Sequence, residues 1–507
     1  ALRPQLQKTI EELLRHGLIE AQAGSPYNSP ILFAPKPNSP TGEMRFCFDA
    51  RELNKVLEDH PYPAPTTEEM FDRVARLQHD ARMAGVEQKL WFSKADARHG
   101  YWQVRVHPDD RDFLAFTVPV LHGSYRWTVL AMGCKSSAAI FQRAMDQVLA
   151  PFGSSNTFRV RRGGYERPVA SSNGVDFDGQ APAASAEAKA GKGEYKTKEG
   201  IAYGTAFSYV DDCLIVSVGS REEHVALVDA VFQAFQKHQF IFKLSKTELY
   251  KQEMDFLGHR LTQSGVTRQA AKVEAIQKWD LPKTQDELRS FISVLGYYRR
   301  FVNGFAKIAQ PLSDMLREGA FQLPYSSEAA DAFYELRRCM VSAPILKYFD
   351  PQHETELWTD ASAKAIGGAV LQRDERGNLR PVAYYSRRLS PSEENYSTYQ
   401  RELLGIRDCL LAFRFYLIGL PFVCKTDHCS LRWLTEQPEM SSLQARWYTV
   451  FQDYHIKEIQ YVKGERNALA DALSRYPDAS EQPLDHLVPP FNMDVAAFLH
   501  LADDVGG

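Results

Sequence analysis

The sequence has 507 residues, of which 44% are hydrophobic and 24% are charged, and its formal net charge is −4. This length exceeds what one hydrophobic core can serve, so we expect about three or four domains of ordinary globular composition. No apolar run reaches the roughly 20 residues of a membrane span, and the net charge excludes a basic surface over the whole chain while leaving room for a local one.

The cysteines and the first residue indicate the setting of the chain. Seven scattered cysteines lack zinc-type C-x-x-C spacing and are odd in number, which predicts reduced thiols in an intracellular protein. The sequence starts with Ala1 rather than Met and carries no signal peptide. We therefore expect a segment of a longer polypeptide.

The first predicted elements are a helix and a pair of strands. Leucine and isoleucine at helical spacing predict a helix over residues 3–20, and strands follow at residues 31–34 and 44–49. Lys36 and Arg45 lie on the Pro/Gly-rich turn and its flank. Two cations there could close over a triphosphate, although solvated surface charges are the plainer explanation.

The next stretch combines helices and strands around one carboxylate. A polar helix is expected over residues 68–90, and the apolar strand after it ends at Asp96. A carboxylate at a strand's end is usually a cap or turn residue, so Asp96 alone is not diagnostic. Further strands and then an amphipathic helix are predicted at residues 104–106, 113–118, 125–130 and 136–149.

Residues 153–203 differ in composition from the rest of the chain. They are rich in Gly, Ala, Ser, Lys and Glu and nearly free of aliphatic side chains. Such a segment cannot bury enough apolar area to offset the entropy of ordering it, so we predict a largely disordered insertion. Its basic residues could contact nucleic acid, or they could belong to a solvated loop.

Two adjacent carboxylates, Asp211 and Asp212, interrupt a run of strand-forming residues. The flanking residues predict two buried strands with the Asp pair at their tight connection. Neighbouring carboxylates repel each other unless a cation lies between them, and Mg²⁺ prefers such hard oxygen ligands. An isolated Asp-Asp pair is also typical of an ordinary hairpin turn.

The middle of the chain predicts strands and core-forming helices, and we expect no chemistry of the two amphipathic helices and the third helix that follow the strands. A helix over residues 221–239, a strand pair at 240–249 and a strand at 256–262 precede two amphipathic helices. The second of these helices starts with a capping box at residues 284–287, and a third helix starts near Ser326.

The last third returns to strands, at residues 356–360, 367–372, 381–386 and 422–426. A helix with a capping box at residues 397–400 carries Glu402, and another predicted helix carries Asp471 in its first turn. With Asp360 and Asp427 at strand ends, these form a second set of carboxylates. Carboxylates that converge in space favour two divalent ions, which stabilise the attacking and leaving oxygens of an in-line phosphoryl displacement.

Many stretches match one family in the right order. MRFCFDARELNK, FSKADARHGYWQV, AIFQRAMDQVL, YVDD and FLGHRLTQSGV resemble the reverse transcriptase of gypsy-type LTR retrotransposons. LPKTQDELRSFISVLGYYRRFV resembles its thumb, and WTDAS, YSTYQRELLGI, CKTDHCSL and GERNALADALSR resemble its fused ribonuclease H. The resemblance extends from about Leu6 to Arg475 except for the insertion.

The resemblance implies roles for individual residues. Asp96, Asp211 and Asp212 would bind two Mg²⁺ or Mn²⁺ ions at the polymerase site, with Asp96 and Asp211 as the principal pair. Two further ions would bind the ribonuclease H carboxylates, Asp360, Glu402, Asp427 and Asp471. The expected nucleotide-binding residues are Lys36, Arg45, Tyr101, Met132 and Gly133, and the expected primer support is Phe256, Leu257 and Gly258.

The resemblance also implies a fold and domain order. We expect a mixed α+β and α/β protein with a right-hand polymerase of fingers, palm and thumb, followed by a ribonuclease H-like α/β domain. The expected boundaries are fingers and palm at 1–265, thumb and connection at 266–350, ribonuclease H at 351–476, and a linker at 477–507.

The expected function is RNA- and DNA-directed DNA polymerisation with cleavage of RNA–DNA hybrids. Its partners would be an RNA template, a DNA primer and deoxynucleoside triphosphates, without a membrane, and with a protease and an integrase outside this chain. The expected location is a cytoplasmic virus-like particle with a nuclear phase, and the sequence leaves a homodimer open. Two alternatives remain: a decayed or domesticated element that only binds nucleic acid, and a nuclease whose polymerase the insertion has disabled.

Overall fold

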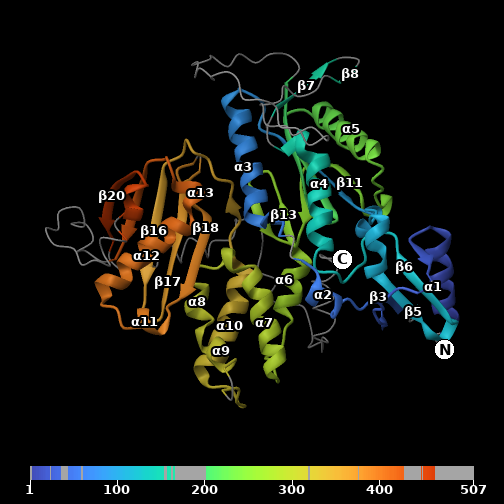
Figure 1. Cartoon of the computed structure of the whole chain (residues 1–507). Coiled ribbons are helices and arrows are strands. Elements are labelled where there is room, and N and C mark those ends of the chain that lie inside the picture. The colour runs from blue at the N-terminus through green and yellow to red at the C-terminus, as the bar shows by residue number, and fades with distance from the viewer. Residues whose placement is uncertain are drawn as a thin grey trace. The chain divides into compact units, whose positions relative to one another are not determined.

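The structure is a computed structural model that describes residues 3–22, 24–35, 44–58, 61–153, 157–161, 164–165, 201–317, 320–374, 376–427, 447 and 449–462 (Figure 1). The chain divides into two compact units, residues 1–254 and 255–507, which are described separately. In the described part, no helix combines the length and apolar character needed to cross a membrane. The six cysteines in these ranges are free thiols.

The first unit starts with a small β-rich region. Its helices and strands are α1 Arg3–Arg15, β1 Ile19–Ala21, β2 Ile31–Pro35, β3 Met44–Phe48, α2 Leu53–Val56, η2 Pro108–Leu114, β5 Ala115–Val118, η3 Pro119–Leu121 and β6 Gly123–Trp127. One sheet has the order β1-β6-β5, and β2 pairs with β3. Aromatic residues such as Phe116 and Trp127 form its core together with leucines of α1.

The larger region of the first unit is built on a six-stranded sheet with the order β11-β4-β10-β9-β7-β8. Its elements are α3 Thr67–Met83, β4 Leu90–Asp96, η1 Gly100–Gln103, α4 Ser137–Gly153, β7 Thr157–Arg161, β8 Gly164–Tyr165, β9 Ile201–Tyr209, β10 Asp212–Val218, α5 Arg221–Lys237, η4 Leu244–Lys246 and β11 Glu248–Lys251. Helices α3, α4 and α5 pack against β9 and β10. These central strands are buried on both faces, which explains their nearly unbroken apolar sequence.

The structure corrects several predicted elements of this unit. The helix expected to reach residue 90 ends at Met83, because Gly85 adopts a left-handed conformation and ends it. Residues 104–106 form one bridge rather than a strand, and residues 108–114 form a 3₁₀ helix. The expected strand pair at 240–249 is a 3₁₀ turn followed by β11, because the chain there hydrogen-bonds to the end of β4.

The predicted insertion is shorter than expected at both ends. Residues 157–161 form β7 and residues 201–203 belong to β9, and the two strands are antiparallel neighbours with Thr157 opposite Tyr203. Residues 166–200 lie outside the described residues. The sheet therefore holds the chain on both sides of this segment.

His224 links α5 to the central strands. Its Nε2 lies 2.8 Å from Ser93 Oγ of β4, and its Nδ1 lies 2.8 Å from Ser217 Oγ of β10. The imidazole is fully buried, and burial lowers its pKa to about 4. The folded protein therefore holds this histidine in its neutral form at neutral pH.

We expect His224 to make the fold sensitive to acid. Its pKa is lower in the folded state than in the unfolded state, so its contribution to stability is lost as the pH falls from about 6.5 to about 4. The full loss is about 3 kcal/mol. In urea unfolding, His224→Gln should depend less on pH over this range than the wild type, while the exposed-site control His238→Gln should match it. An equally steep pH dependence in His224→Gln would contradict this role.

The second unit begins with a hairpin and a group of helices. These elements are β12 Met254–Phe256, β13 His259–Leu261, β14 Gly265–Arg268, α6 Ala270–Gln277, α7 Gln285–Tyr297, η5 Arg299–Phe301, α8 Phe305–Ile308, α9 Gln310–Met315, α10 Ser327–Ser342 and β15 Leu346–Lys347. Helices α7 and α10 begin at the predicted caps, Thr284 and Ser326. Four short strands form a sheet in the order β12-β13-β14-β15.

The second unit also contains a five-stranded sheet with the order β18-β17-β16-β19-β20 (Figure 1). Its elements are β16 Thr355–Ala361, β17 Ala365–Arg373, β18 Leu379–Arg388, α11 Pro391–Glu394, α12 Thr398–Ala412, α13 Arg414–Leu417, β19 Phe422–Thr426 and β20 Ile456–Tyr461. Strand β19 is parallel to β16 and β20, and the other pairs are antiparallel. Helix α12 packs on β16 and β17, and α8 packs on β17 and β18.

Candidate active sites

Asp96, Asp211 and Asp212 meet at one end of the central strands of the first unit. Asp96 is the last residue of β4, Asp212 is the first residue of β10, and the two are cross-strand partners. Asp211 lies in the two-residue turn between β9 and β10, and its carbonyl accepts a 2.8 Å hydrogen bond from the Ala97 N–H. The fold therefore brings the first predicted carboxylate set together.

The turn that carries Asp211 has a strained residue, Val210, with φ of +50°. A β-branched residue rarely adopts this conformation, so the surroundings must hold it there. Gln142 of α4 does so: its Oε1 accepts from the Val210 N–H at 2.7 Å, and its Nε2 donates to the Ser208 carbonyl at 3.0 Å. Gln142 was not predicted from the sequence, although a polar residue on the apolar face of a predicted helix could have indicated a functional contact.

Burial and mutual repulsion shape the ionisation of these carboxylates. Burial, followed by the charge of Asp96, raises the pKa values of Asp211 and Asp212 to about 6. Lys243 and Lys246 oppose this rise, and their Nζ atoms lie 3.1 and 3.3 Å from the two carboxylate oxygens of Asp96. The sequence analysis assigned no role to these lysines because it expected a strand pair there.

Gly100 and Tyr101 complete the surroundings of Asp211. A Cβ at position 100 would lie 1.9 Å from Asp211 Oδ1 and 2.8 Å from the Phe141 ring, so a side chain there would displace the carboxylate. The half-buried Tyr101 ring packs edge-on against Phe141 at a centroid distance of 5.7 Å. Burial and the charge of Asp211 raise the pKa of Tyr101, which therefore remains a neutral phenol beside the carboxylates.

The predicted nucleotide-binding residues are only partly described. Lys36 and the side chain of Arg45 lie outside the described residues. Met132 is exposed, and Gly133 has φ of +103° in the next turn. Asn54 fixes this turn by donating to the Gly133 carbonyl at 2.8 Å and accepting from the backbone N–H of residue 135 at 2.9 Å. The roles of these residues toward a nucleotide remain predictions.

Phe256, Leu257 and Gly258 form a hairpin turn in the second unit, so the prediction of a continuous strand over 256–262 was wrong. Strand β12 ends at Phe256 and β13 begins at His259. Leu257 and Gly258 have φ of +46° and +71°, the two positive values typical of a type I′ turn. The helical and strand propensities used for prediction do not detect a turn whose first central residue is leucine.

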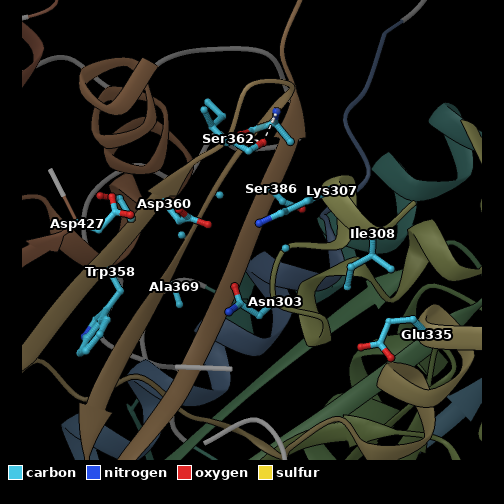
Figure 2. Close-up of a pocket in the computed structure, with 16 residues that line it drawn as sticks. Asn303, Lys307, Ile308, Glu335, Trp358, Asp360, Ser362, Ala369, Ser386 and Asp427 are labelled. Carbon is cyan, nitrogen blue, oxygen red and sulfur yellow. Dashed lines mark hydrogen bonds between the residues drawn. The ribbon is translucent and has the colours of Figure 1, made fainter. Parts of the chain in front are cut away.

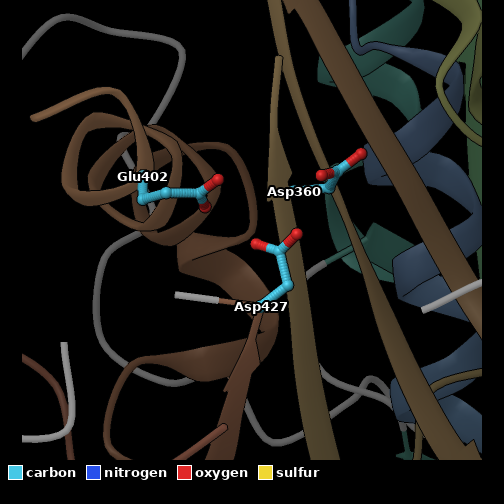
Figure 3. Close-up of side chains that lie close together, drawn as sticks. All are labelled: Asp360, Glu402 and Asp427. Carbon is cyan, nitrogen blue, oxygen red and sulfur yellow. The ribbon is translucent and has the colours of Figure 1, made fainter. Parts of the chain in front are cut away.

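Three carboxylates of the second predicted set converge where the central strands β16 and β19 of the five-stranded sheet end (Figure 3). Asp360 lies in β16, Glu402 in α12, and Asp427 directly after β19. One oxygen from each lies within 4.8 Å of the others. The fourth member, Asp471, lies outside the described residues.

Burial and mutual repulsion disfavour the charged forms of carboxylates in the second set. Burial raises the pKa of Glu402 to about 9, and the charges of Asp427 and Asp360 add to this rise. Burial also raises the pKa of Asp360, while the charge of Lys307 opposes the rise. Such crowding of anions is costly unless a cation joins them.

A cavity of about 450 Å³ opens beside Asp360 within the second unit (Figure 2). Helix α8 and strands β16, β17 and β18 supply its walls, and its lining includes Asn303, Lys307, Ser386 and Asp427. Gly367, the cross-strand partner of Asp360, leaves the floor of the cavity beside that carboxylate without a side chain. The cavity thus gives access to Asp360.

Both carboxylate sets fit a hard divalent cation. Asp211 Oδ1 and Glu402 Oε2 are buried and lack a hydrogen-bond partner among the described residues. Orphaned carboxylate oxygens and an all-oxygen donor set suit Mg²⁺ or Mn²⁺.

Two known families match separate parts of the chain. Residues 34–261 match the family described as reverse transcriptase (RNA-dependent DNA polymerase), and residues 350–454 match the RNase H-like domain found in reverse transcriptase. The chain therefore combines a reverse transcriptase domain with an RNase H-like domain of the kind found in reverse transcriptases. The predicted family resemblance is therefore confirmed.

Curated proteins that are similar to this chain include transposon polyproteins. The chain is 29% identical over 473 residues to the retrovirus-related Pol polyprotein from transposon 297 of Drosophila melanogaster, covering 93% of this chain and 38% of the relative. It is 28% identical over 476 residues to the transposon Tf2-3 polyprotein of Schizosaccharomyces pombe, covering 93% and 30%. The chain thus spans less than half the length of these relatives.

Solved structures support the fold. The foamy viral protease-reverse transcriptase in complex with double-stranded DNA matches with a TM-score of 0.63 and 22% identity, covering 91% of this chain and 82% of that one. The same viral protein in complex with an RNA/DNA hybrid matches with a TM-score of 0.64 and 21% identity, covering 96% and 56%. They confirm the predicted fold class, a mixed α/β polymerase followed by an RNase H-like domain.

Proposed function

We propose that the chain copies RNA and DNA templates into DNA and cleaves the RNA strand of RNA–DNA hybrids, as part of a retrotransposon Pol polyprotein. The observation that carries this proposal is the convergence of carboxylates inside each matched domain. Asp96, Asp211 and Asp212 gather in the polymerase domain, and Asp360, Glu402 and Asp427 gather in the RNase H-like domain. Each set would hold two Mg²⁺ or Mn²⁺ ions, with Asp471 as a further ligand of the second set.

In the polymerase site, the bound ions would supply stabilisation of the attacking and leaving oxygens of phosphoryl transfer. The residues of this chain would prepare the site for them. Gln142 holds the strained turn, and so fixes where Asp211 points. Gly100 leaves the space that the Asp211 carboxylate occupies. Tyr101 would lie under the deoxyribose and oppose a 2′-hydroxyl, while Lys36 and Arg45 would grip the triphosphate near Met132 and Gly133.

In the RNase H-like site, the same kind of ion chemistry would activate a water molecule for attack on phosphorus. Helix α12 places the buried Glu402 beside Asp360 and Asp427. Lys307 lines the adjoining cavity, where its positive charge suits a strand phosphate. A 2′-hydroxyl would let this site distinguish RNA from DNA.

The pairing of β7 with β9 weighs against a nuclease with a disabled polymerase. The strand that leads into Asp211 keeps a continuous register with β10, from Tyr203 opposite Val218 to Tyr209 opposite Asp212. A segment that leaves and rejoins one sheet adds loop entropy, which grows slowly with length, without shifting that register. We therefore favour a bifunctional enzyme over the nuclease-only alternative.

One assay tests the proposed function. Primer extension on an RNA template, with a labelled RNA strand followed in parallel, should show DNA synthesis and RNA cleavage that both require Mg²⁺ or Mn²⁺. DNA synthesis without RNA cleavage would support the polymerase activity alone. RNA cleavage without DNA synthesis would support the ribonuclease H activity alone. Binding of the hybrid without either reaction would support the decayed or domesticated alternative.

We expect Gly100→Ala to separate the two activities. Because the added methyl group would overlap Asp211 Oδ1, extension should fall by about a hundredfold. Cleavage of the hybrid should stay near the wild-type rate. Gly296→Ala is the matched control, because a Cβ there would meet no atom within 4 Å. Normal extension by Gly100→Ala would contradict the placement of Asp211.

The remaining partners and the cellular location follow from the proposed function. We propose an RNA template, a DNA primer and deoxynucleoside triphosphates as substrates, and protease and integrase segments elsewhere in the polyprotein. A cytoplasmic virus-like particle with a nuclear phase would be the setting. Sedimentation of the purified chain would distinguish a monomer from a homodimer.

A further inference from the structure

Two consecutive tyrosines of the second unit hold the turn at Leu257 and Gly258. Tyr297 Oη donates a 2.7 Å hydrogen bond to the Leu257 carbonyl, and Tyr298 Oη donates one of 3.1 Å to the Gly258 carbonyl. Tyr297 is the last residue of α7 and Tyr298 is its C-cap. The end of one helix therefore grips both central carbonyls of the β12–β13 turn.

The turn requires such help because its own sequence disfavours its conformation. Type I′ turns need positive φ at both central residues, which Asn-Gly adopts easily and a leucine does not. Leu257 nevertheless has φ of +46°. Interactions from elsewhere in the fold must supply what the local sequence lacks.

The surroundings of the turn fit these interactions closely. His259 Nδ1 lies 2.7 Å from the Leu257 carbonyl, which can only accept, so the ring nitrogen donates. The Leu257 carbonyl thus has two donors. At Gly258, a Cβ would lie 2.7 Å from Tyr298 Oη, so the missing side chain admits the tyrosine hydroxyl. The His259 ring also stacks on Phe301 at a centroid distance of 5.6 Å, which anchors the assembly.

We propose that Tyr297 and Tyr298 are positioning residues for DNA synthesis. They would act through the turn that they hold, which would support the primer end. This inference rests on the proposed polymerase function. Tyr297 is the more informative of the two, because this residue is 46% exposed and adds little to the core, whereas Tyr298 is 3% exposed.

The test uses Tyr297→Phe, Tyr298→Phe and the double variant of the full chain, which keep the rings and remove the hydroxyls. Tyr334→Phe, on the exposed side of α10, is the matched control. Each protein is assayed for the kcat and nucleotide KM of primer extension, for primer–template Kd, for hybrid cleavage and for Tm. Cleavage and Tm report on damage to the second unit.

Each single variant should lower the kcat of extension by about threefold to tenfold, as expected for loss of one hydrogen bond. The double variant should lose more, while primer–template Kd, hybrid cleavage and Tm stay near wild type. Wild-type extension by the double variant would overturn the inference, and so would a parallel loss of extension, cleavage and Tm. If the wild-type chain extends no primer, the proposed polymerase function is contradicted, and this inference falls because it rests on that function.

Discussion

Asp211→Asn should lower primer extension by about a thousandfold or more while hybrid cleavage stays within about twofold of wild type. The amide keeps the shape of the side chain but loses the charge that would hold a divalent ion. It also removes repulsion from Asp96 and Asp212, so the variant should fold at least as stably as wild type. Single-nucleotide incorporation on an RNA template, with the labelled RNA strand followed in the same reaction, measures both activities.

The matched control is Asp229→Asn, an α5 substitution at a residue that pairs only locally, accepting from Gln233 at 2.7 Å. It should leave both activities unchanged. Asp212→Asn should cost less than Asp211→Asn if Asp96 and Asp211 form the principal pair. Primer extension that persists in Asp211→Asn would contradict the proposal that this carboxylate set catalyses DNA synthesis.

Glu402→Gln should have the opposite selectivity. It should lower hybrid cleavage by about a thousandfold while primer extension stays near wild type, because Glu402 is the buried member of the second carboxylate set. Release of the RNA fragment from a preformed hybrid measures the loss. Glu394→Gln, at the half-buried end of α11 and 3.9 Å from Arg388, serves as the control.

The same variant offers a readout of metal binding that does not depend on activity. In a chelator, Glu402→Gln should raise the Tm by a few degrees, because it relieves a buried carboxylate crowded by Asp360 and Asp427. With Mg²⁺, the wild type should gain stability and the variant should gain less. Equal Mg²⁺ stabilisation of both proteins would contradict a metal site at these three residues.

The sequence was sufficient for the features that depend on local patterns and on shared motifs. Apolar runs that end in a carboxylate predicted β4 and β19, and capping boxes predicted where α7 and α12 begin. Asp96, Asp211 and Asp212 could be grouped because each lies at or next to the end of a predicted strand. The structure then supplied the pairing of Asp96 with Asp212, which no periodicity encodes.

The residues that the sequence analysis missed act through contacts distant in sequence. Gln142 reaches Val210 across 68 positions, and Lys246 reaches Asp96 across 150. The turn at Leu257 was read as strand because leucine is apolar and favours neither turn nor positive φ. Its conformation depends on Tyr297, 40 residues away, rather than on its neighbours. Long-range hydrogen bonds of this kind leave no local signature.

The antiparallel pairing of β7 with β9 has a practical consequence for experiments. Because Tyr165 closes β8 and Ile201 opens β9 in one sheet, both attachment points of residues 166–200 are fixed by the fold. A fluorescent protein or an affinity tag could therefore be joined at these two points in place of that segment. Such a fusion would attach a reporter to β8 on one side and to β9 on the other, and β9 is itself a strand of the Asp211 hairpin.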